Sequence, residues 1–212
     1  MALPIQVDAI RVALLQKYGG IWMDLDIIIT NRKFLSMVNI SNLVMLGNQE
    51  KKNQNIGFIY ASKKSNIIKI WLKYIIKRIS YFRLISFIKN YYQNNYIKNE
   101  WEKVHKWNYL GNGIVDKYLI NVSKKEFARI DRNNIGAFPE YNFIKNESSS
   151  INKYKKFYFS NGNAEDALKF SKGIICLHNS WTPIKYKNIS KEKFLNLDIL
   201  ISKLFRLLIK SL

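Results

Sequence analysis

Apolar residues at helical spacing open the chain and predict an α-helix that ends near residue 18. Four of them recur every three or four positions, the period of one helix face: Val7, Ile10, Leu14 and Tyr18. Gly19 and Gly20 follow at once, and glycine directly after a helix is a common C-terminal cap. We therefore expect a helix closed by a glycine turn.

Short apolar runs after this turn predict β-strands. Residues 21–23 carry no charge and indicate a strand buried on both faces, and Ile27–Ile29 indicates a second extended piece. Leu43–Leu46, residues 56–61 and residues 173–178 are predicted as further strands. Strands that alternate with helices are typical of the α/β fold class.

Two longer segments predict helices. Residues 66–92 are mostly helical in pattern, with Asn66 as the N-cap. Residues 192–212 form one amphipathic helix, with Leu204 on its apolar face and Lys203 on its polar face. The Ser- and Asn-rich stretch 146–152 is predicted as a loop.

These elements suggest one large domain followed by a C-terminal helix. We expect the domain to cover residues 1–190, with a helical lobe at residues 66–110, and the amphipathic helix to occupy residues 191–212. That helix is open to two interpretations, which are packing against the domain and peripheral attachment to a membrane. The Tyr and Trp side chains of residues 91–109 similarly fit lobe packing or the stacking of a bound sugar ring.

Charge is distributed unevenly along the chain. The formal net charge is +20, yet residues 1–50 hold four cations and four acids. Residues 51–99 hold eleven cations and no acid. Such an excess suits anionic lipid surfaces, nucleic acid or phosphorylated substrates, and a solvated surface is the alternative.

Cysteine and histidine are too few for several classes of protein. Cys176 is the single cysteine, so an intrachain disulfide is excluded and a reducing compartment such as the cytoplasm fits best. Two histidines and one cysteine do not build a zinc finger. Residues 67–92, the most apolar tract, contain six cations and are not expected to span a membrane.

Asp24 and Asp26 are the main candidates for chemistry. In an extended segment, residues two apart point to the same side, so both carboxylates would face one spot. Their repulsion at the end of a buried strand would be relieved by Mn²⁺ or Mg²⁺, which prefer carboxylate oxygen. The same cation can bridge a diphosphate. An Asp-x-Asp pair also arises often by chance, so its context decides.

That context contains a second polar pair and a family resemblance. Asp8 and Arg11 lie three positions apart on the preceding helix, where such a pair is commonly a surface ion bridge. The relevant residues follow in the order Asp8, Arg11, Gly19, Gly20, Trp22, Asp24 and Asp26. This series resembles the sugar-binding region of DxD glycosyltransferases. They include capsular polysaccharide synthesis proteins, initiating α-mannosyltransferases of the yeast Golgi type and bacterial glucosylating toxins.

The resemblance implies a GT-A-like fold and a retaining transfer from a nucleotide-sugar donor to a glycan or lipid-linked acceptor. It implies that Asp26 binds the metal and that Asp24 contacts the metal or the ribose. Asp8 and Arg11 would hold the donor sugar, and the aromatic ring of Trp22 would stack near the nucleotide, although Tyr is the more usual residue there.

Similarity downstream is looser. Residues 55–58 resemble the segment after the DxD strand, residues 111–113 resemble a Gly-Pro turn, and residues 138–139 resemble a closing motif. The last matching stretch consists of His178, Asn179, Ser180 and Trp181. The resemblance implies that it covers the diphosphate, with His178 or a neighbour near the metal. Both His178 and Trp181 also fit an ordinary structural role.

Twenty-three residues precede Asp24. Because GT-A enzymes bind the nucleotide base with a β-α-β unit before the DxD strand, we expect this domain to be N-terminally incomplete. Two other hypotheses are therefore kept: a basic nucleic-acid-binding protein, for which no RRM, zinc-finger or basic-zipper pattern is present, and a catalytically inactive remnant. The preferred hypothesis is a glycosyltransferase of surface polysaccharide synthesis, located either in the cytoplasm or peripherally at the inner face of the cell membrane.

Overall fold

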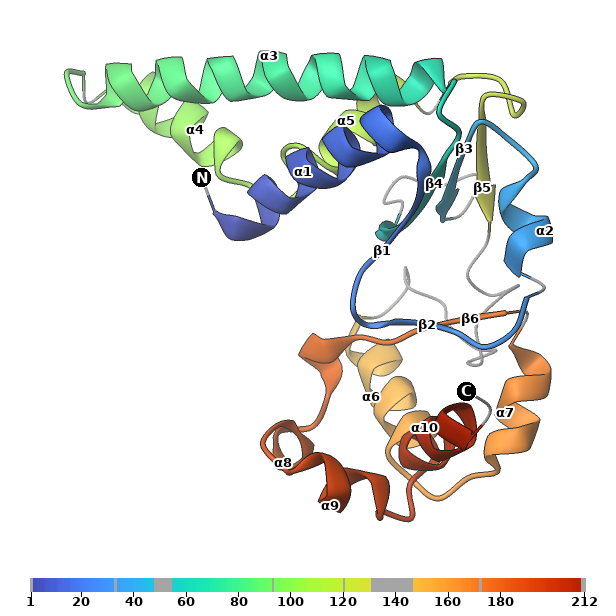
Figure 1. Ribbon diagram of the computed structural model, residues 1–212. Coiled ribbons are helices and arrows are strands. Elements are labelled where there is room, and N and C mark those ends of the chain that lie inside the picture. The colour runs from blue at the N-terminus through green and yellow to red at the C-terminus, as the bar shows by residue number, and fades with distance from the viewer. Residues whose placement is uncertain are drawn as a thin grey trace. The chain divides into compact units, whose positions relative to one another are not determined.

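The computed structural model describes residues 2–32, 34–47, 55–92, 94–119, 121–130, 147–171 and 173–210. The chain forms two compact units (Figure 1). Unit 1 comprises Met1–Met23 and Val38–Ile130, and unit 2 comprises Asp24–Met37 and Asp131–Leu212. This division differs from the expected boundary at residue 190, because the C-terminal segment packs inside unit 2.

Unit 1 begins with the predicted helix, α1 (Leu3–Tyr18). It ends at Gly19, whose φ of 69° favours glycine and whose N–H donates to the Leu15 carbonyl at 2.8 Å. A Cβ atom on Gly19 would lie 2.8 Å from the Lys63 backbone nitrogen. The helix and its glycine cap are therefore confirmed.

The buried face of α1 is not the one that the apolar spacing suggested. The buried apolar side chains are Ile5, Val12 and Leu15, and the largely exposed ones are Ile10, Leu14 and Tyr18. Two polar residues, Asp8 and Arg11, lie on the buried face, where they form an ion pair. Because Asp8 and Arg11 neutralise each other, these two polar residues can be buried against the core. The apolar residues Ile10, Leu14 and Tyr18 lie on the solvent side, so their spacing did not mark the buried face of the helix.

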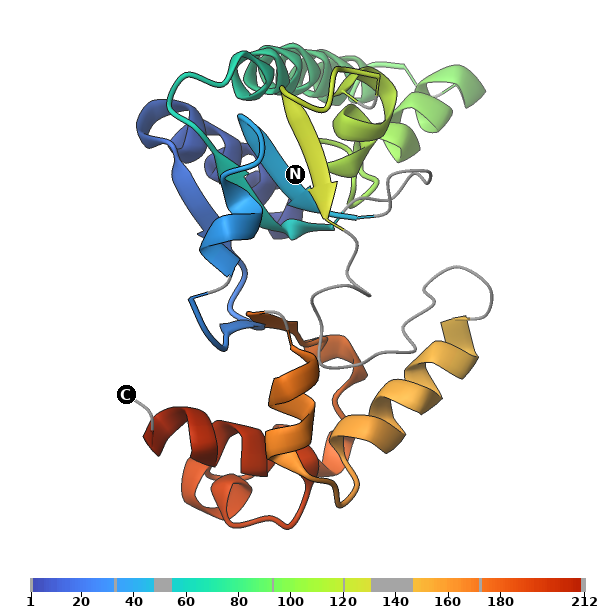
Figure 2. The same ribbon diagram turned by 90° about the vertical axis from the view of Figure 1, so that its right-hand side faces the viewer.

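A four-stranded sheet with the order β1-β4-β3-β5 forms the centre of unit 1 (Figure 2). Its strands are β1 (Gly20–Met23), β3 (Leu43–Leu46), β4 (Asn55–Ala61) and β5 (Phe127–Ile130). Both β1 and β3 run antiparallel to β4, and β5 runs parallel to β3. The four residues of β3 are buried, as a central strand requires.

The first strand departs from its prediction. Ile21 and Met23 are exposed, because β1 is an edge strand that pairs only with β4 among the described strands. The expectation that residues 21–23 are buried on both faces was wrong. A run of three uncharged residues does not distinguish an edge strand from a central one, because strand neighbours come from distant parts of the chain.

The longest helix of unit 1 is α3 (Asn66–Lys89), and its N-cap is Ser65 rather than Asn66. The Ser65 hydroxyl accepts from the Ile68 N–H at 3.4 Å. Helix α4 (Asn95–Val104), which lies within the predicted helical lobe, begins where the Asn94 side chain accepts from the Ile97 N–H at 2.9 Å. The remaining helical pieces are α5 (Asn112–Ile114) and the π-helical segment η1 (Val115–Leu119).

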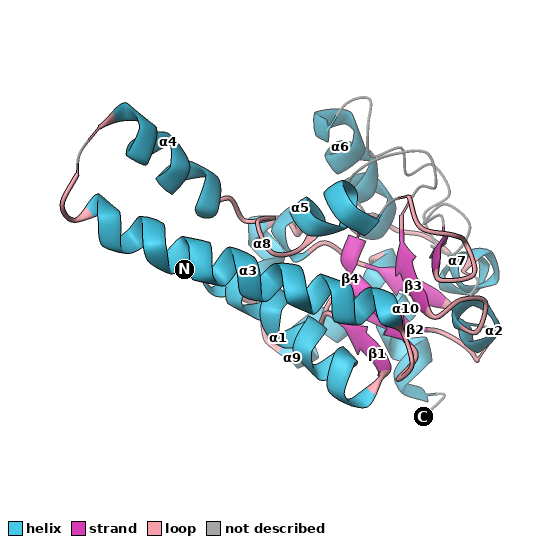
Figure 3. Cartoon of the chain, turned by 90° about the horizontal axis from the view of Figure 1, so that it is seen from above, coloured by secondary structure: helices cyan, strands magenta, loops and turns pink. Residues whose placement is uncertain are grey.

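The core of unit 1 lies between α3, α1 and the sheet. Trp71 of α3 is completely buried there, and its indole N–H donates to the Leu110 carbonyl at 3.0 Å. Figure 1 shows α1, α4 and α5 on one side of α3, and Figure 3 shows α4 alongside its C-terminal half.

Unit 2 contains a two-stranded antiparallel sheet, in which β2 (Ile27–Ile29) pairs with β6 (Ile174–Cys176). Its helices are α2 (Phe34–Val38, whose last residue belongs to unit 1), α6 (Glu147–Tyr158), α7 (Ala164–Phe170), α8 (Ile184–Lys187), α9 (Lys191–Leu195) and α10 (Leu200–Lys210). Both predicted strands are confirmed.

The loop predicted at residues 146–152 was wrong from Glu147 onward, since α6 begins there. Tyr154 and Tyr158 lie one helical turn apart on α6 and are both buried in the core of unit 2. Packing of this aromatic face stabilises a helix that Ser and Asn residues would not favour on their own. The Phe138-Pro139 motif, which resembles a closing motif of the family, lies outside the described residues.

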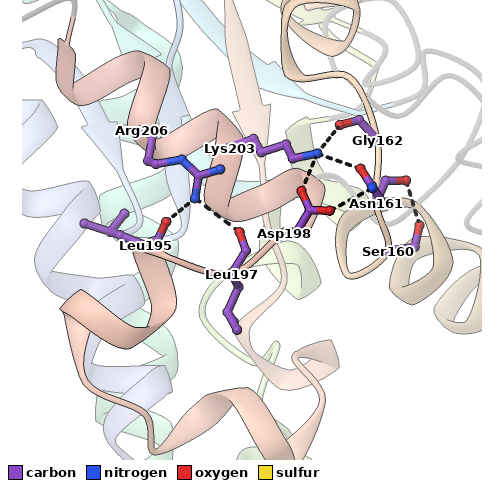
Figure 4. A network of polar contacts seen from close by, with 8 residues as sticks. All are labelled: Ser160, Asn161, Gly162, Leu195, Leu197, Asp198, Lys203 and Arg206. Atoms are coloured by element: carbon purple, nitrogen blue, oxygen red, sulfur yellow. Dashed lines mark hydrogen bonds and ion pairs between the residues drawn. The ribbon is translucent and has the colours of Figure 1, made fainter.

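The C-terminal segment is two helices rather than one. Between α9 and α10, the Arg206 side chain donates to the Leu195 and Leu197 carbonyls, and Lys203 contacts Asp198 at 2.7 Å (Figure 4). Leu200 and Leu204 are buried against the rest of unit 2. The packing interpretation of this segment is therefore confirmed.

Helices and strands are mixed in both units, so the predicted α/β class is confirmed. Among the described residues, none of the helices combines the length and the apolar character that crossing a membrane requires.

Candidate functional site

The two carboxylates of the DxD motif lie on a tight turn of unit 2. The Asp24 carbonyl accepts a hydrogen bond from the Ile27 N–H at 3.0 Å, which closes a four-residue β-turn just before β2. Leu25 at its tip is fully exposed, and Asp24 and Asp26 are half-buried. The prediction of an extended segment was wrong here, because the chain reverses at the motif and Asp favours such turns.

This turn is joined to the segment that follows β6. The Leu177 N–H donates to the Asp26 carbonyl at 2.8 Å, which extends the β2–β6 ladder beyond the Ile27–Cys176 pair. The next residue is His178, so the second Asp of the motif and the predicted closing segment are neighbours. These two motifs are about 150 positions apart in the sequence.

Tyr154 of α6 fixes the closing segment from the other side. Its hydroxyl accepts from the His178 backbone N–H at 2.9 Å. Its ring meets the Trp181 ring edge-on at a centroid distance of 5.3 Å, and the His178 and Trp181 rings stack at 4.4 Å. Sequence reasoning missed Tyr154, whose one available signal is its helical spacing from Tyr158 in a lysine-rich stretch.

The pKa of the Tyr154 phenol is raised to about 12, chiefly by burial; the hydrogen bond from the His178 N–H opposes this rise, and the negative charge of Asp26 adds to it. The phenol therefore stays protonated at physiological pH.

The remaining residues of the closing segment are accessible. Asn179 and Ser180 are exposed and belong to the 3₁₀ turn η3 (Asn179–Trp181), whereas His178 and Trp181 are half-buried. The ring stacking gives His178 and Trp181 a packing role. Whether they also contact a ligand stays a prediction.

The described residues contain no cluster of three or more His, Cys, Asp or Glu side chains that would hold a metal ion by themselves. Asp24 and Asp26 can supply two carboxylates from a partly exposed turn. Mg²⁺ is usually held by one or two carboxylates together with substrate phosphates and water, so this donor set fits a hard cation that arrives with a diphosphate. The ligand set of Asp24, Asp26 and His178 stays a prediction.

Asp8 and Arg11 form an ion pair in unit 1, with Nη2 of Arg11 3.4 Å from Oδ1 of Asp8. Their exposed fractions are only 3% and 5%, so the pair is buried and is not the surface bridge that the spacing commonly gives. Arg11 also donates to the Ile56 carbonyl, and its guanidinium lies 5.3 Å from the centroid of the Trp22 ring.

The turn motif at residues 111–113 lies next to the Asp8–Arg11 pair. A Cβ atom on Gly111 would lie 2.6 Å from Oδ2 of Asp8 and 2.4 Å from Cδ1 of Ile56, so a larger residue there would displace these two side chains. Unit 1 thus brings together Asp8, Arg11, Trp22, Ile56 and Gly111. Asp24, Asp26 and His178 belong to unit 2.

We expect Tyr154→Phe to loosen the closing segment, because it leaves the His178 backbone N–H without its acceptor. The free energy of unfolding should fall by about 1–2 kcal/mol, measured by urea denaturation of the full chain. Tyr186→Phe is the matched control, since this half-buried tyrosine of the same unit stacks on Phe159 through its ring. Equal losses in both variants would contradict the role of the Tyr154 hydroxyl.

Comparison with known proteins adds one match. The family model of the capsular polysaccharide synthesis proteins matches residues 5–158, which include Asp8, Arg11, Trp22 and the DxD turn but not the closing segment. No curated protein and no solved structure matches the chain. The family match covers well over half of the sequence. The chain therefore belongs to the capsular polysaccharide synthesis protein family.

Proposed function

We propose that this protein is a metal-dependent glycosyltransferase with a GT-A-like fold. Membership of the family indicates a role in capsular polysaccharide synthesis. The observation that carries the finer proposal is the DxD turn, which is hydrogen-bonded through Asp26 to the segment that leads into His178. Two partly exposed carboxylates beside a polar, accessible segment are suited to a nucleotide-sugar bound through a divalent cation.

In this proposal Asp24 and Asp26 hold Mn²⁺ or Mg²⁺. The bound cation supplies positive charge that stabilises the departing nucleoside diphosphate. The exposed Asn179 and Ser180 donate hydrogen bonds to the diphosphate, and Tyr154 holds their segment in place through His178. Asp8 and Arg11 act on the donor sugar, as the family resemblance implies.

The reaction is the transfer of a sugar to a glycan or lipid-linked acceptor. The bond between the anomeric carbon and the diphosphate oxygen breaks, and a bond forms between that carbon and an acceptor hydroxyl, which loses its proton. The nucleoside diphosphate leaves. The family resemblance implies that the anomeric configuration is retained.

The test is isothermal titration of the full chain with a panel of nucleotide-sugars, with Mn²⁺ present and with EDTA. We expect one donor to bind with a Kd in the micromolar to millimolar range, as is usual for enzyme substrates, and only when Mn²⁺ is present. Absence of metal-dependent binding across the panel would contradict the proposal and favour a catalytically inactive protein.

A further inference from the structure

The outward face of α3 is unusual for a helix that packs on a domain. The described elements of unit 1 lie on one side of this helix (Figures 1 and 2). The buried side chains Ile67, Trp71 and Ile75 point to that side. The opposite face runs the length of the 24-residue helix, about 36 Å at 1.5 Å per residue.

This outward face combines cations with large apolar side chains. Its exposed cations, spaced at helical intervals, are Lys69, Lys73, Lys77 and Arg83. Interleaved with them are four exposed apolar residues: Ile70, Ile76, Leu84 and Phe87. The exposed fractions of Ile76 and Phe87 reach 57% and 63%. Exposing this much apolar surface to water is energetically unfavourable. No acidic residue occurs between residues 51 and 99.

The aromatic residues that follow α3 extend this surface. The Phe87 and Tyr91 rings contact each other at a centroid distance of 5.0 Å, and Tyr91, Tyr92 and Tyr96 are all exposed. Tyrosine is enriched where the apolar part of a membrane meets its polar headgroups, because its ring is apolar and its hydroxyl is polar. In contrast, Lys89 points toward α4, where its ammonium lies 4.0 Å from the centroid of the Trp101 ring.

Three kinds of partner could cover this surface: nucleic acid, a second copy of the chain, or an anionic lipid bilayer. Nucleic acid would neutralise the cations, but Ile70, Ile76 and Leu84 have no aromatic face on which bases could stack. A second copy of this chain in a two-fold dimer would bring the same positive face against itself. An anionic bilayer satisfies both components, since phosphate headgroups meet the cations and the acyl boundary takes the apolar side chains.

We propose that the outward face of α3, continued by Tyr91, Tyr92 and Tyr96, binds the surface of an anionic lipid bilayer. The helix lies parallel to the membrane plane and does not cross it. The segment α9–α10 takes no part, because the apolar face that carries Leu200, Ile201 and Leu204 is packed inside unit 2. This inference goes beyond sugar transfer. Its test requires neither donor nor metal, so the two proposals can fail independently.

The first experiment is cosedimentation of the full chain with vesicles of phosphatidylcholine and phosphatidylglycerol at a ratio of 3:1, and of phosphatidylcholine alone. We expect binding to the anionic vesicles only. The quadruple variant Lys69→Gln, Lys73→Gln, Lys77→Gln and Arg83→Gln should bind at least about a hundredfold more weakly, because each cation near an anionic surface contributes about fivefold.

The matched control removes the same number of cations from unit 2, where four exposed lysines lie on α8 and α9. This variant is Lys185→Gln, Lys187→Gln, Lys191→Gln and Lys193→Gln. Its vesicle binding should stay within about threefold of the original chain. An equal loss in both quadruple variants would mean that only net charge matters and would overturn the proposal.

A second measurement tests insertion of the apolar side chains. Because Cys176 is the single cysteine, Cys176→Ser combined with Phe87→Cys allows one environment-sensitive fluorophore to be attached on α3. Its emission should shift to shorter wavelength when anionic vesicles are added, and a label at Lys185→Cys should not shift. An unshifted emission at position 87, tighter binding to single-stranded or duplex DNA than to vesicles, or dimerisation through this face would overturn the proposal.

Discussion

Asp26→Asn should reduce Mn²⁺-dependent binding of the nucleotide-sugar at least about a hundredfold, because a neutral amide replaces a carboxylate at the cation. Sugar transfer should fall by at least as much. The variant keeps the size of the side chain and leaves the backbone bond from Leu177 to the Asp26 carbonyl in place. Titration calorimetry with and without Mn²⁺ measures the change.

Asp166→Asn is the control for this variant. Asp166 lies in unit 2, is exposed on α7 and pairs with Lys169 at 3.3 Å, so its substitution removes one negative charge from the same unit. Donor binding should remain within about twofold of the original chain, as expected for a surface charge. If the Asp26→Asn variant bound the donor with unchanged affinity, Asp26 would not be a metal ligand.

Asp8→Leu should destabilise the protein by about 3–5 kcal/mol, because it leaves the Arg11 guanidinium buried without its carboxylate. The double variant Asp8→Leu with Arg11→Met should recover most of this loss, since it replaces a buried ion pair with apolar groups. Urea denaturation of the single and double variants measures both effects.

The exposed pair Asp166–Lys169 is the matched control for this pair. It has the same i,i+3 spacing on a helix and a similar separation, 3.3 Å against 3.4 Å, and differs in its exposure. Asp166→Leu should cost less than about 1 kcal/mol. Comparable losses at the two sites would contradict the burial of the Asp8–Arg11 pair.

The double variant also separates structure from function. If Asp8 and Arg11 hold the donor sugar, the refolded double variant binds the nucleotide-sugar more weakly by at least about tenfold, since charged hydrogen bonds to hydroxyls are lost. A stable double variant with unchanged donor affinity would leave the pair with a structural role alone. The same titration used for Asp26→Asn gives the answer.

Local sequence signals predicted much of the secondary structure. The glycine turn at Gly19, the strands Leu43–Leu46 and Ile27–Ile29, and the helix that begins near Asn66 follow from spacing and capping within a few residues. Helix α6 and its Tyr154 were missed, because a Ser- and Asn-rich helix start is stabilised by aromatic packing that involves distant elements.

The order of Asp8, Arg11, Trp22, Asp24 and Asp26 along the chain was enough to suggest the family, because this pattern is local. The burial and the hydrogen-bond partners of these residues could not be predicted from the sequence. The burial of Asp8 and Arg11 depends on Ile56 and Gly111, and the backbone partner of Asp26 is Leu177, directly after β6. Burial, strand position and hydrogen-bond partners are set by long-range contacts, so only the tertiary structure decided them.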